Sequence, residues 1–221
     1  IQPLLNGISD IVLTRRIVAL DPGHGGEDPG TKSIIGDHFE KEYTLDWARR
    51  LRPLLEAQGW QVYLTRTNDV RLSLNDRVNF ADRVGAILFI SLHFNSAFPN
   101  LKQSGLETYC LTPSGMPSNL TRNFPDDSKE VFPNNAFDLQ NVELAMRLHR
   151  SVIETTKRPD RGVRRARFMG VLRGHQRPAV LIEGGYLSNP QEARLIADPA
   201  FRQKLAESIA NALNQVPVKE L

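Results

Sequence analysis

Four side chains of this 221-residue chain could together form a hydrolytic metal site. His24 and His93 each follow a short apolar run, Glu183 ends a third such run, and Glu40 stands where a helical pattern begins. Zinc accepts imidazole nitrogen and carboxylate oxygen, and a catalytic zinc keeps three protein ligands and one open position. A separate carboxylate could then accept the proton of an attacking water. These residue types therefore indicate metal-assisted hydrolysis.

Each of these residues also has a purely structural explanation. A histidine near a strand end is usually only hydrogen-bonded, and the helix dipole favours a glutamate such as Glu40 in a first helical turn. Glu183 is harder to explain in this way, because a carboxylate at the end of a buried strand needs a partner or a function. Spacing alone supports the metal site and the structural roles about equally.

Other chemistries are less well supported by the sequence. The glycines of 23–30 suggest a phosphate-binding loop, but neither a Gly-Lys-Ser/Thr nor a Gly-x-Gly-x-x-Gly pattern accompanies them. Ser91 and Ser188 lack the setting of a nucleophile elbow. The single cysteine, Cys110, excludes an intramolecular disulfide, and we expect it to be a packed side chain rather than a nucleophile.

The composition is that of an ordinary soluble globular domain. Hydrophobic residues make up 40% and charged residues 24% of the chain, and the formal net charge is +3. This mildly basic balance does not indicate a nucleic-acid-binding protein. No apolar run approaches the roughly 18 residues of a membrane span. Residues 1–10 lack the features of a signal peptide, as a mature chain also would.

The elements that must position the four residues alternate between strand and helix. Short apolar runs predict strands at 17–21, 61–66, 86–93, 105–111 and 178–186. Helical periodicity predicts helices from residue 40 to about 58 with Pro53 inside the pattern, at 74–84 with Ser73 or Asn75 as N-cap, and at 142–156, 190–197 and 199–214.

This alternation predicts an α/β fold: a single domain with a mixed, mostly parallel sheet of about six strands flanked by helices, as in phosphorylase/hydrolase-like folds. The run at 86–93 is the most apolar, so we expect its strand to be central. In such sheets, ligands bind beyond the carboxyl ends of the strands, where His24 and His93 stand.

Two segments differ from the rest of the chain in amino-acid composition. Residues 112–138 are rich in Pro, Asn, Ser and Asp and predict an irregular insertion, which either lies over the site or is mobile. Residues 157–177 are basic. Such clusters are more often a solvated face, and the functional alternative is attraction to an acidic polymer. Residues 1–16 are interpreted as a lead-in and 217–221 as a tail.

Five motifs occur in order along about 17–213: LDPGHGGEDPG at 20–30, EK at 40–41, TR at 65–66, FISLHFN at 89–95 and VLIEGGYLSN at 180–189. Together they closely resemble the motifs of the zinc-dependent N-acetylmuramoyl-L-alanine amidases of bacterial cell walls. The resemblance implies a mixed α/β sheet flanked by helices. It also implies a zinc amidase catalytic domain at 17–216 that carries the insertion.

The resemblance further implies a role for each site residue. His24, Glu40 and His93 would bind one Zn²⁺, and Glu183 would be the general base. The substrate would be peptidoglycan, cut at the amide between the lactyl group of N-acetylmuramic acid and L-alanine of the stem peptide. Asp21 and Asn95 are candidates for orienting the ligands. Arg66 and Arg77 match family positions, and for them a structural salt bridge is expected rather than contact with substrate.

The chain departs from the family pattern at Phe94 and Tyr186, neither of which is expected to touch a metal ligand. Activator-controlled members carry an inhibitory helix whose glutamate occupies the zinc. Glu130 is the only glutamate in the insertion, so a site open without an activator is predicted. The setting would be periplasmic or extracellular, in cell-wall remodelling, cell separation or autolysis.

Two other functions stay open at this point. One is a zinc peptidase that acts on another amide, and the other is a non-catalytic peptidoglycan-binding module. No nucleic-acid partner is expected, and an activator or a wall-targeting domain could lie outside this chain. The stem-peptide preference and the oligomeric state do not follow from the sequence.

Overall fold

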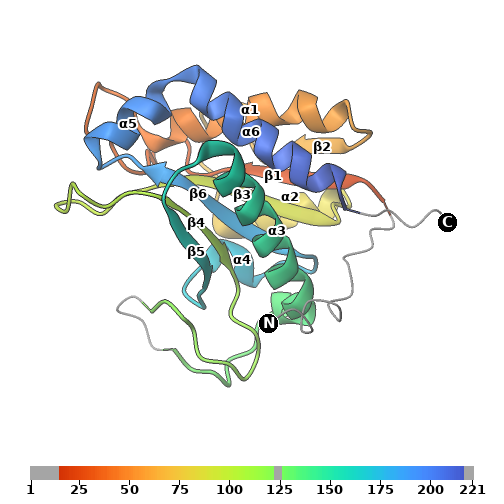
Figure 1. The fold of residues 1–221 in the computed structure, drawn as a ribbon. Coiled ribbons are helices and arrows are strands. Elements are labelled where there is room, and N and C mark those ends of the chain that lie inside the picture. The colour runs from red at the N-terminus through yellow and green to blue at the C-terminus, as the bar shows by residue number, and fades with distance from the viewer. Residues whose placement is uncertain (1–14, 122–125, 217–221) are drawn as a thin grey trace.

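A six-stranded sheet with helices on both faces organises the chain (Figure 1). The computed structural model describes residues 15–121 and 126–216. The strand order is β2-β1-β3-β6-β4-β5. β1 (Ile17–Pro22), β2 (Gln61–Leu64), β3 (Leu88–Asn95) and β6 (Ala179–Tyr186) run in parallel. β4 (Leu106–Cys110) is antiparallel to β6, and β5 (Asp160–Arg165) follows the direction of β4. The predicted mixed, mostly parallel sheet is confirmed, with β3 and β6 at its centre.

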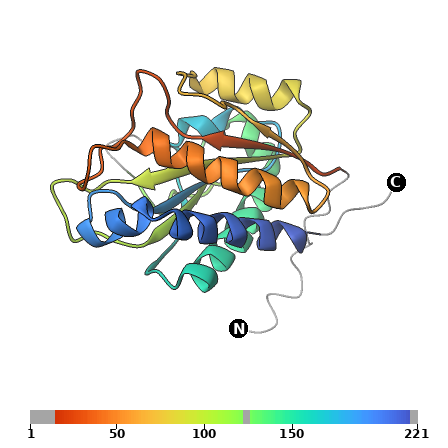
Figure 2. The ribbon, with the colours of Figure 1, turned by 90° about the horizontal axis from the view of Figure 1, so that it is seen from above.

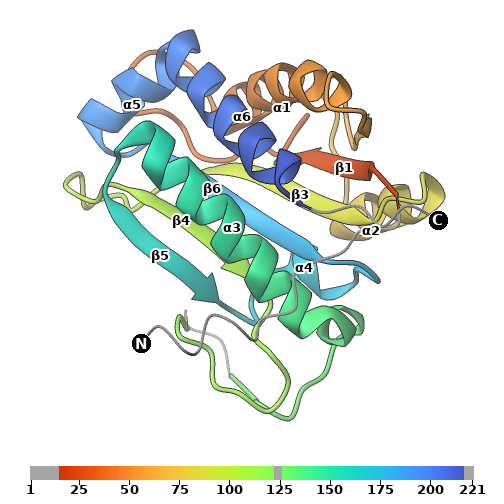
Figure 3. The same ribbon diagram turned by 45° about the vertical axis from the view of Figure 1, so that its right-hand side comes forward.

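The helices form two layers of unequal size. α1 (Glu40–Glu56), α3 (Asp138–Thr156) and α6 (Pro199–Asn214) cover one face of the sheet, with α1 and α6 side by side (Figures 2 and 3). α2 (Leu74–Arg83) and the short α4 (Gly170–Arg173) lie on the opposite face, while α5 (Pro190–Ala197) follows β6. None of the helices among the described residues is long and apolar enough to span a bilayer.

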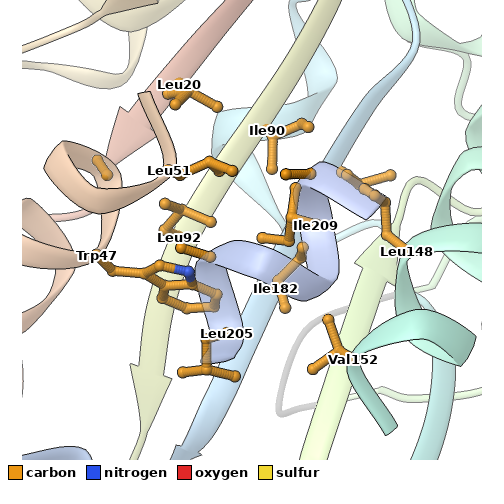
Figure 4. Close-up of a cluster of buried hydrophobic side chains, with 14 of the residues drawn as sticks. Leu20, Trp47, Leu51, Ile90, Leu92, Leu148, Val152, Ile182, Leu205 and Ile209 are labelled. Carbon is orange, nitrogen blue, oxygen red and sulfur yellow. The ribbon is translucent and has the colours of Figure 1, made fainter. Parts of the chain in front are cut away.

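The larger hydrophobic cluster lies between the sheet and the three long helices (Figure 4). Leu92 and Ile182 reach it from the two central strands, and Trp47, Leu148 and Leu205 reach it from α1, α3 and α6. All five side chains are fully buried. Because successive residues of a strand point to opposite faces, the neighbours Ser91, His93, Leu181 and Glu183 point to the α2/α4 face.

Most predicted elements are present, with small shifts at their ends. α1 continues through Pro53 to Glu56, and α3 begins at Asp138, four residues earlier than predicted. The N-cap of α2 is Ser73, whose hydroxyl accepts the Asp76 N–H at 3.1 Å, so the alternative cap Asn75 was wrong. β5 and α4 were not predicted. β5 reads Asp-Arg-Gly-Val-Arg-Arg, and this edge strand has no alternation of apolar and polar residues to reveal it.

The interpretation of the basic stretch 157–177 as a solvated face is wrong for most of its arginines. Arg158 pairs with Glu192, Arg161 with Glu107, Arg167 with Asp126, and Arg177 with Asp82. The positive charge of this stretch is therefore mostly balanced within the fold. This leaves less of it for an acidic polymer than the sequence suggested.

The insertion at 112–138 leaves the sheet at the end of β4, opposite Val180 at the start of β6. Its described residues are irregular except for a 3₁₀ turn at Pro133–Phe137, and Glu130 is exposed. Arg167, just after β5, donates hydrogen bonds to Asp126 and to the Pro113 carbonyl, which both belong to the insertion. Residues 122–125 lie outside the described residues, so the prediction that the insertion covers the site stays a prediction.

Cys110 is fully buried in β4, as expected for a packed side chain. Burial raises the pKa of its thiol to about 12. A thiol with so high a pKa does not form the reactive thiolate near neutral pH. This excludes the nucleophilic role that the sequence had left open.

Truncating the α3 side of the core tests the described packing. Leu148→Ala should lower the free energy of unfolding by about 3 kcal/mol, because it leaves a cavity at a fully buried position. Leu139→Ala, on the same helix but 80% exposed, is the matched control and should change it by less than about 0.5 kcal/mol. Equal effects of the two substitutions in urea titrations would contradict the packing.

Candidate metal centre and active site

The three predicted ligands converge near the carboxyl ends of β1 and β3. One ligand atom each from His24, Glu40 and His93 lies within 4.8 Å of the others. His24 Nε2 is 3.1 Å from Glu40 Oε2, and His93 Nδ1 is 2.9 Å from Glu40 Oε1. Ligand atoms around a tetrahedral zinc lie about 3.3 Å apart, given bonds of about 2.0 Å. The separations and the N, N, O donor set therefore fit a zinc ion.

The glycine-rich loop after β1 makes room for these side chains. A Cβ on Gly23 would lie 2.2 Å from the His93 ring, and one on Gly30 would lie 2.6 Å from Glu40 Oε2. His24 itself has φ +63°, a left-handed conformation that L-residues rarely adopt. Such strain persists where the surroundings fix the backbone and is frequent at functional sites.

Hydrogen bonds fix the orientation of the cluster. Asp28 Oδ1 lies 2.9 Å from His24 Nδ1, which turns the Nε2 atom of that ring toward Glu40. The N–H groups of Thr31 and Phe94 donate to the two oxygens of Glu40, each at 3.0 Å. The expectation that Phe94 touches no ligand was therefore wrong for its backbone, although its side chain packs in the core beside Trp47.

The site stabilises positive charge between the two rings. Burial alone would raise the pKa of Glu40, but hydrogen bonds and charge interactions with His24 and His93 hold it well below its usual value. Burial alone would lower the pKa of His24, yet Glu40 and Asp28 raise it. A buried carboxylate between two imidazoles thus favours a cation at this point, as a divalent metal ion requires.

Glu183 lies beside this cluster on β6. Its Cα is paired with that of His93 on β3 and with that of Glu107 on β4. All three side chains point to the α2/α4 face. Phe89, Leu181 and Tyr109 pack in the hydrophobic cluster on that face, and each is an even number of residues away from His93, Glu183 or Glu107 on the same strand. Glu183 is 8% exposed and is not one of the three clustered ligands.

Asp21 acts on the site through Arg77. Its buried carboxylate accepts hydrogen bonds from Thr65, Ser91 and Arg77, and Arg77 also donates to the His24 carbonyl at 3.0 Å. Burial by itself would raise the pKa of Asp21, but Arg77 and the three hydrogen bonds outweigh it and lower the pKa. Asp21 and Arg77 thus form a buried ion pair that holds the histidine loop.

Arg66 and Asn95 have other neighbours than expected. Arg66 donates to the carbonyls of Pro22, Gly23 and Lys41 and forms no ion pair with any described residue. It therefore supports the loop without the salt bridge that the sequence suggested. Asn95 donates to Glu107 at 3.2 Å rather than to a metal ligand.

A cavity of about 730 Å³ adjoins the cluster on the α2/α4 face. His24 and His93 lie in its wall, and the start of α2 and the residues Gly170 and Val171 of α4 form its other side. Leu72, Leu74 and Leu181 add apolar surface. An extended substrate could therefore pass the metal ligands on this face of the sheet.

The sequence assigned no role at the site to two carboxylates, Asp28 and Glu107, although Asp28 lies within the LDPGHGGEDPG motif. Asp28 follows His24 by four residues, but in a glycine-rich loop this spacing carries no meaning without the fold. Glu107 lies in an apparently ordinary alternating strand, and only the pairing of β4 with β6 places it beside Glu183. No local signal identified either role.

Comparisons with known proteins agree with this geometry. A family model described as N-acetylmuramoyl-L-alanine amidase matches residues 18–215. The chain belongs to this amidase family. The N-acetylmuramoyl-L-alanine amidase AmiA of Salmonella typhimurium is 32% identical in an alignment that covers 90% of this chain and 75% of that protein.

Solved amidase structures share the fold. An N-acetylmuramoyl-L-alanine amidase from Clostridium difficile 630 has 30% identity and a TM-score of 0.75, covering 90% of this chain and 95% of that one. The CwlD amidase of Clostridioides difficile, solved in complex with the GerS lipoprotein, has 26% identity and a TM-score of 0.75. The alignment covers 91% of this chain and 98% of CwlD. This chain is therefore a single α/β amidase domain.

Zinc titration tests the cluster. Wild-type protein should bind one Zn²⁺ per chain, and Asp28→Ala should weaken binding roughly 10- to 100-fold because His24 loses its orienting partner. Glu40→Ala should weaken it further, since it removes a ligand. Glu56→Ala, at the far end of α1, is the control and should bind zinc like wild type. Undiminished zinc binding by Glu40→Ala in chelator competition would exclude this site.

The Asp21–Arg77 pair makes stability depend on pH. Asp21→Asn should lower the free energy of unfolding at pH 7 by about 3–5 kcal/mol, because it leaves a buried arginine charge unpaired. Since the pKa of Asp21 is lower in the folded than in the unfolded chain, its contribution is complete above pH 3.8 and disappears as the pH falls through the folded value. The deficit should therefore shrink below pH 3.8, and a deficit independent of pH would count against the pair.

Proposed function

We propose that this chain is a zinc-dependent amidase in which His24, Glu40 and His93 bind the metal and Glu183 is the general base. The bond cut is the amide between the lactyl group of N-acetylmuramic acid and L-alanine of the peptidoglycan stem peptide. Membership in the amidase family supports the reaction. The single observation that carries the site assignment is the convergence of two imidazoles on the Glu40 carboxylate.

The protein side of the mechanism follows from the placement of Glu183. A zinc ion bound at the cluster would polarise the amide carbonyl and lower the pKa of a water molecule. Glu183 is beside His93 on the neighbouring strand, so its carboxylate can accept the proton of the attacking water. The same group can then return the proton to the departing L-alanine nitrogen. The Asp21–Arg77 pair and Asp28 keep the histidine loop in position throughout.

The biological setting is proposed from the family. Peptidoglycan lies outside the cytoplasmic membrane, so we propose a periplasmic or extracellular enzyme of cell-wall remodelling, cell separation or autolysis. We take 17–216 as the zinc amidase domain. A protein partner is compatible with this role, and the complex of CwlD with a lipoprotein supports it. Access to the site without an activator stays a prediction, supported by the exposure of Glu130.

Digestion of purified peptidoglycan tests the function. Zinc-loaded wild type should release stem peptides that begin with L-alanine, identified by mass spectrometry. Glu183→Gln should lower the rate about 10²- to 10⁴-fold by removal of the general base, with one zinc per chain retained. Glu130→Gln is the control and should have wild-type activity.

Other results of this digestion would indicate another function or contradict part of the proposal. Peptides of a different mass would indicate a zinc peptidase that acts on another amide. Binding to peptidoglycan without any release would indicate a wall-binding module. Higher activity of Glu130→Gln would contradict the prediction of a site without an inhibitory glutamate.

A further inference from the structure

Two arginines of β5 lie on the same face of the sheet as Glu183. Leu106 pairs with Asp160 and Thr108 with Val163, so two residues of β5, Arg161 and Gly162, lie opposite the single residue Glu107. This is a β-bulge, and Gly162 supplies its left-handed backbone with φ +84°. The bulge lets both Arg161 and Arg164 turn toward Glu107, where strict alternation would send them to opposite faces.

Arg161 is held firmly in this position. Its Nε donates to Glu107 Oε1 at 2.8 Å, and its guanidinium lies over the Tyr186 ring, 5.4 Å from the ring centre. The Gln103 side chain, in the amide orientation that satisfies its hydrogen bonding, accepts from the two terminal nitrogens. Glu107 in turn accepts from Asn95 and Tyr109. The hydrogen-bonding capacity of Arg161 is thus largely used within the protein.

Arg164 differs from Arg161. Within the part of the chain that the structure describes, its one polar contact is an ion pair between Nε and Glu107 Oε1 at 3.5 Å, and its side chain is 28% exposed. Arg161 occupies Glu107 with a hydrogen bond at 2.8 Å, so the terminal nitrogens of Arg164 are not used by this carboxylate. An arginine fork with unused terminal nitrogens is suited to bind a carboxylate with two hydrogen bonds.

The position of Arg164 relative to the metal ligands matches that of a carboxylate in the proposed substrate. His93, Glu183 and Glu107 form a row across β3, β6 and β4, and Arg161 continues it on β5, so the row spans about 14 Å. The 730 Å³ cavity lies at the other end, beside His24 and α2. In the stem peptide, the residue after L-alanine carries a carboxylate about two residues, or roughly 7 Å, from the scissile amide. A peptide that runs along the row would bring this group about half-way along it, close to Glu107, and the side chain of Arg164 reaches this point with Nε 3.5 Å from Glu107 Oε1.

We infer that Arg164, supported by Arg161 and Glu107, is a specificity-determining residue that binds the carboxylate of the second stem-peptide residue. This inference rests on the proposed function and identifies the side of the site on which the peptide lies. Stem peptides with a free carboxylate at this residue are then preferred over those in which it is amidated. Arg164 contacts the substrate but takes no part in bond cleavage.

Calorimetry on a cleavage-deficient background tests the inference. The ligands are N-acetylmuramoyl-L-alanyl-D-isoglutaminyl-L-lysine and N-acetylmuramoyl-L-alanyl-γ-D-glutamyl-L-lysine. In both, the γ-carboxyl of the second residue is bonded to lysine, so the two differ only in whether its α-carboxyl is amidated or free. The protein is zinc-loaded Glu183→Gln. The free acid should bind roughly 10- to 100-fold more tightly than the amide, as expected for hydrogen bonds between charged groups. Adding Arg164→Gln should reduce this ratio to about one, and adding Arg164→Lys should retain part of it.

Arg165→Gln is the matched control, because it makes the same charge change one residue further along β5, on the opposite face. It should leave the preference intact. A preference that survives Arg164→Gln, or equal binding of both ligands to the parent protein, would overturn the inference. Cleavage of the two tripeptide ligands by wild type is measured separately, so a failure of the proposed amidase function is distinguished from a failure of this inference.

Discussion

The contact on which the site depends is that of one buried carboxylate, Glu40, with two imidazole rings. Glu40 comes from the start of α1, whereas His24 follows β1 and His93 lies two residues before the end of β3. The contact therefore requires β1, β3 and α1 to be correctly packed. The backbone amides of Thr31 and Phe94 fix the carboxylate from the other side. Without a cation or protons between these groups, burial of the carboxylate would be costly. The fold is thus built to hold positive charge at this point.

The sheet topology explains why the chemistry lies on one face. Three long helices cover one face of the sheet (Figure 3). On the α2/α4 face, the cavity lies beside His24, His93 and Leu181. The reversal of β4 and β5 brings Glu107 and the two arginines to the same region. The site therefore combines ligands from the parallel half of the sheet with charged groups from its antiparallel edge.

The sequence predicted the parallel half well. β1, β3 and β6 begin as apolar runs. His24 follows β1, and His93 and Glu183 lie in the carboxyl-terminal halves of β3 and β6, where the topology of an α/β sheet brings them together. The family motifs add Glu40, whose acidic side chain would otherwise be explained by the helix dipole.

The antiparallel edge could not be predicted in the same way. β5 is rich in arginine because its side chains form ion pairs across strands, and such partners are not visible in a local pattern. The orientation of Arg161 depends on a bulge at Gly162, which only the register of β4 against β5 reveals. Asp21, Arg66 and Arg77 were all recognised as candidates, but the contacts of Arg66 with three backbone carbonyls follow only from the fold.

The most direct test of the account is an anomalous difference map at the zinc absorption edge from crystals of the zinc-loaded protein. The account predicts one peak bonded to His24, Glu40 and His93, at about 2.0–2.2 Å from one atom of each. It further predicts that the Glu183 carboxylate faces the open position without being a ligand. A peak on other residues, or Glu183 bound to the metal in place of Glu40, would contradict the account.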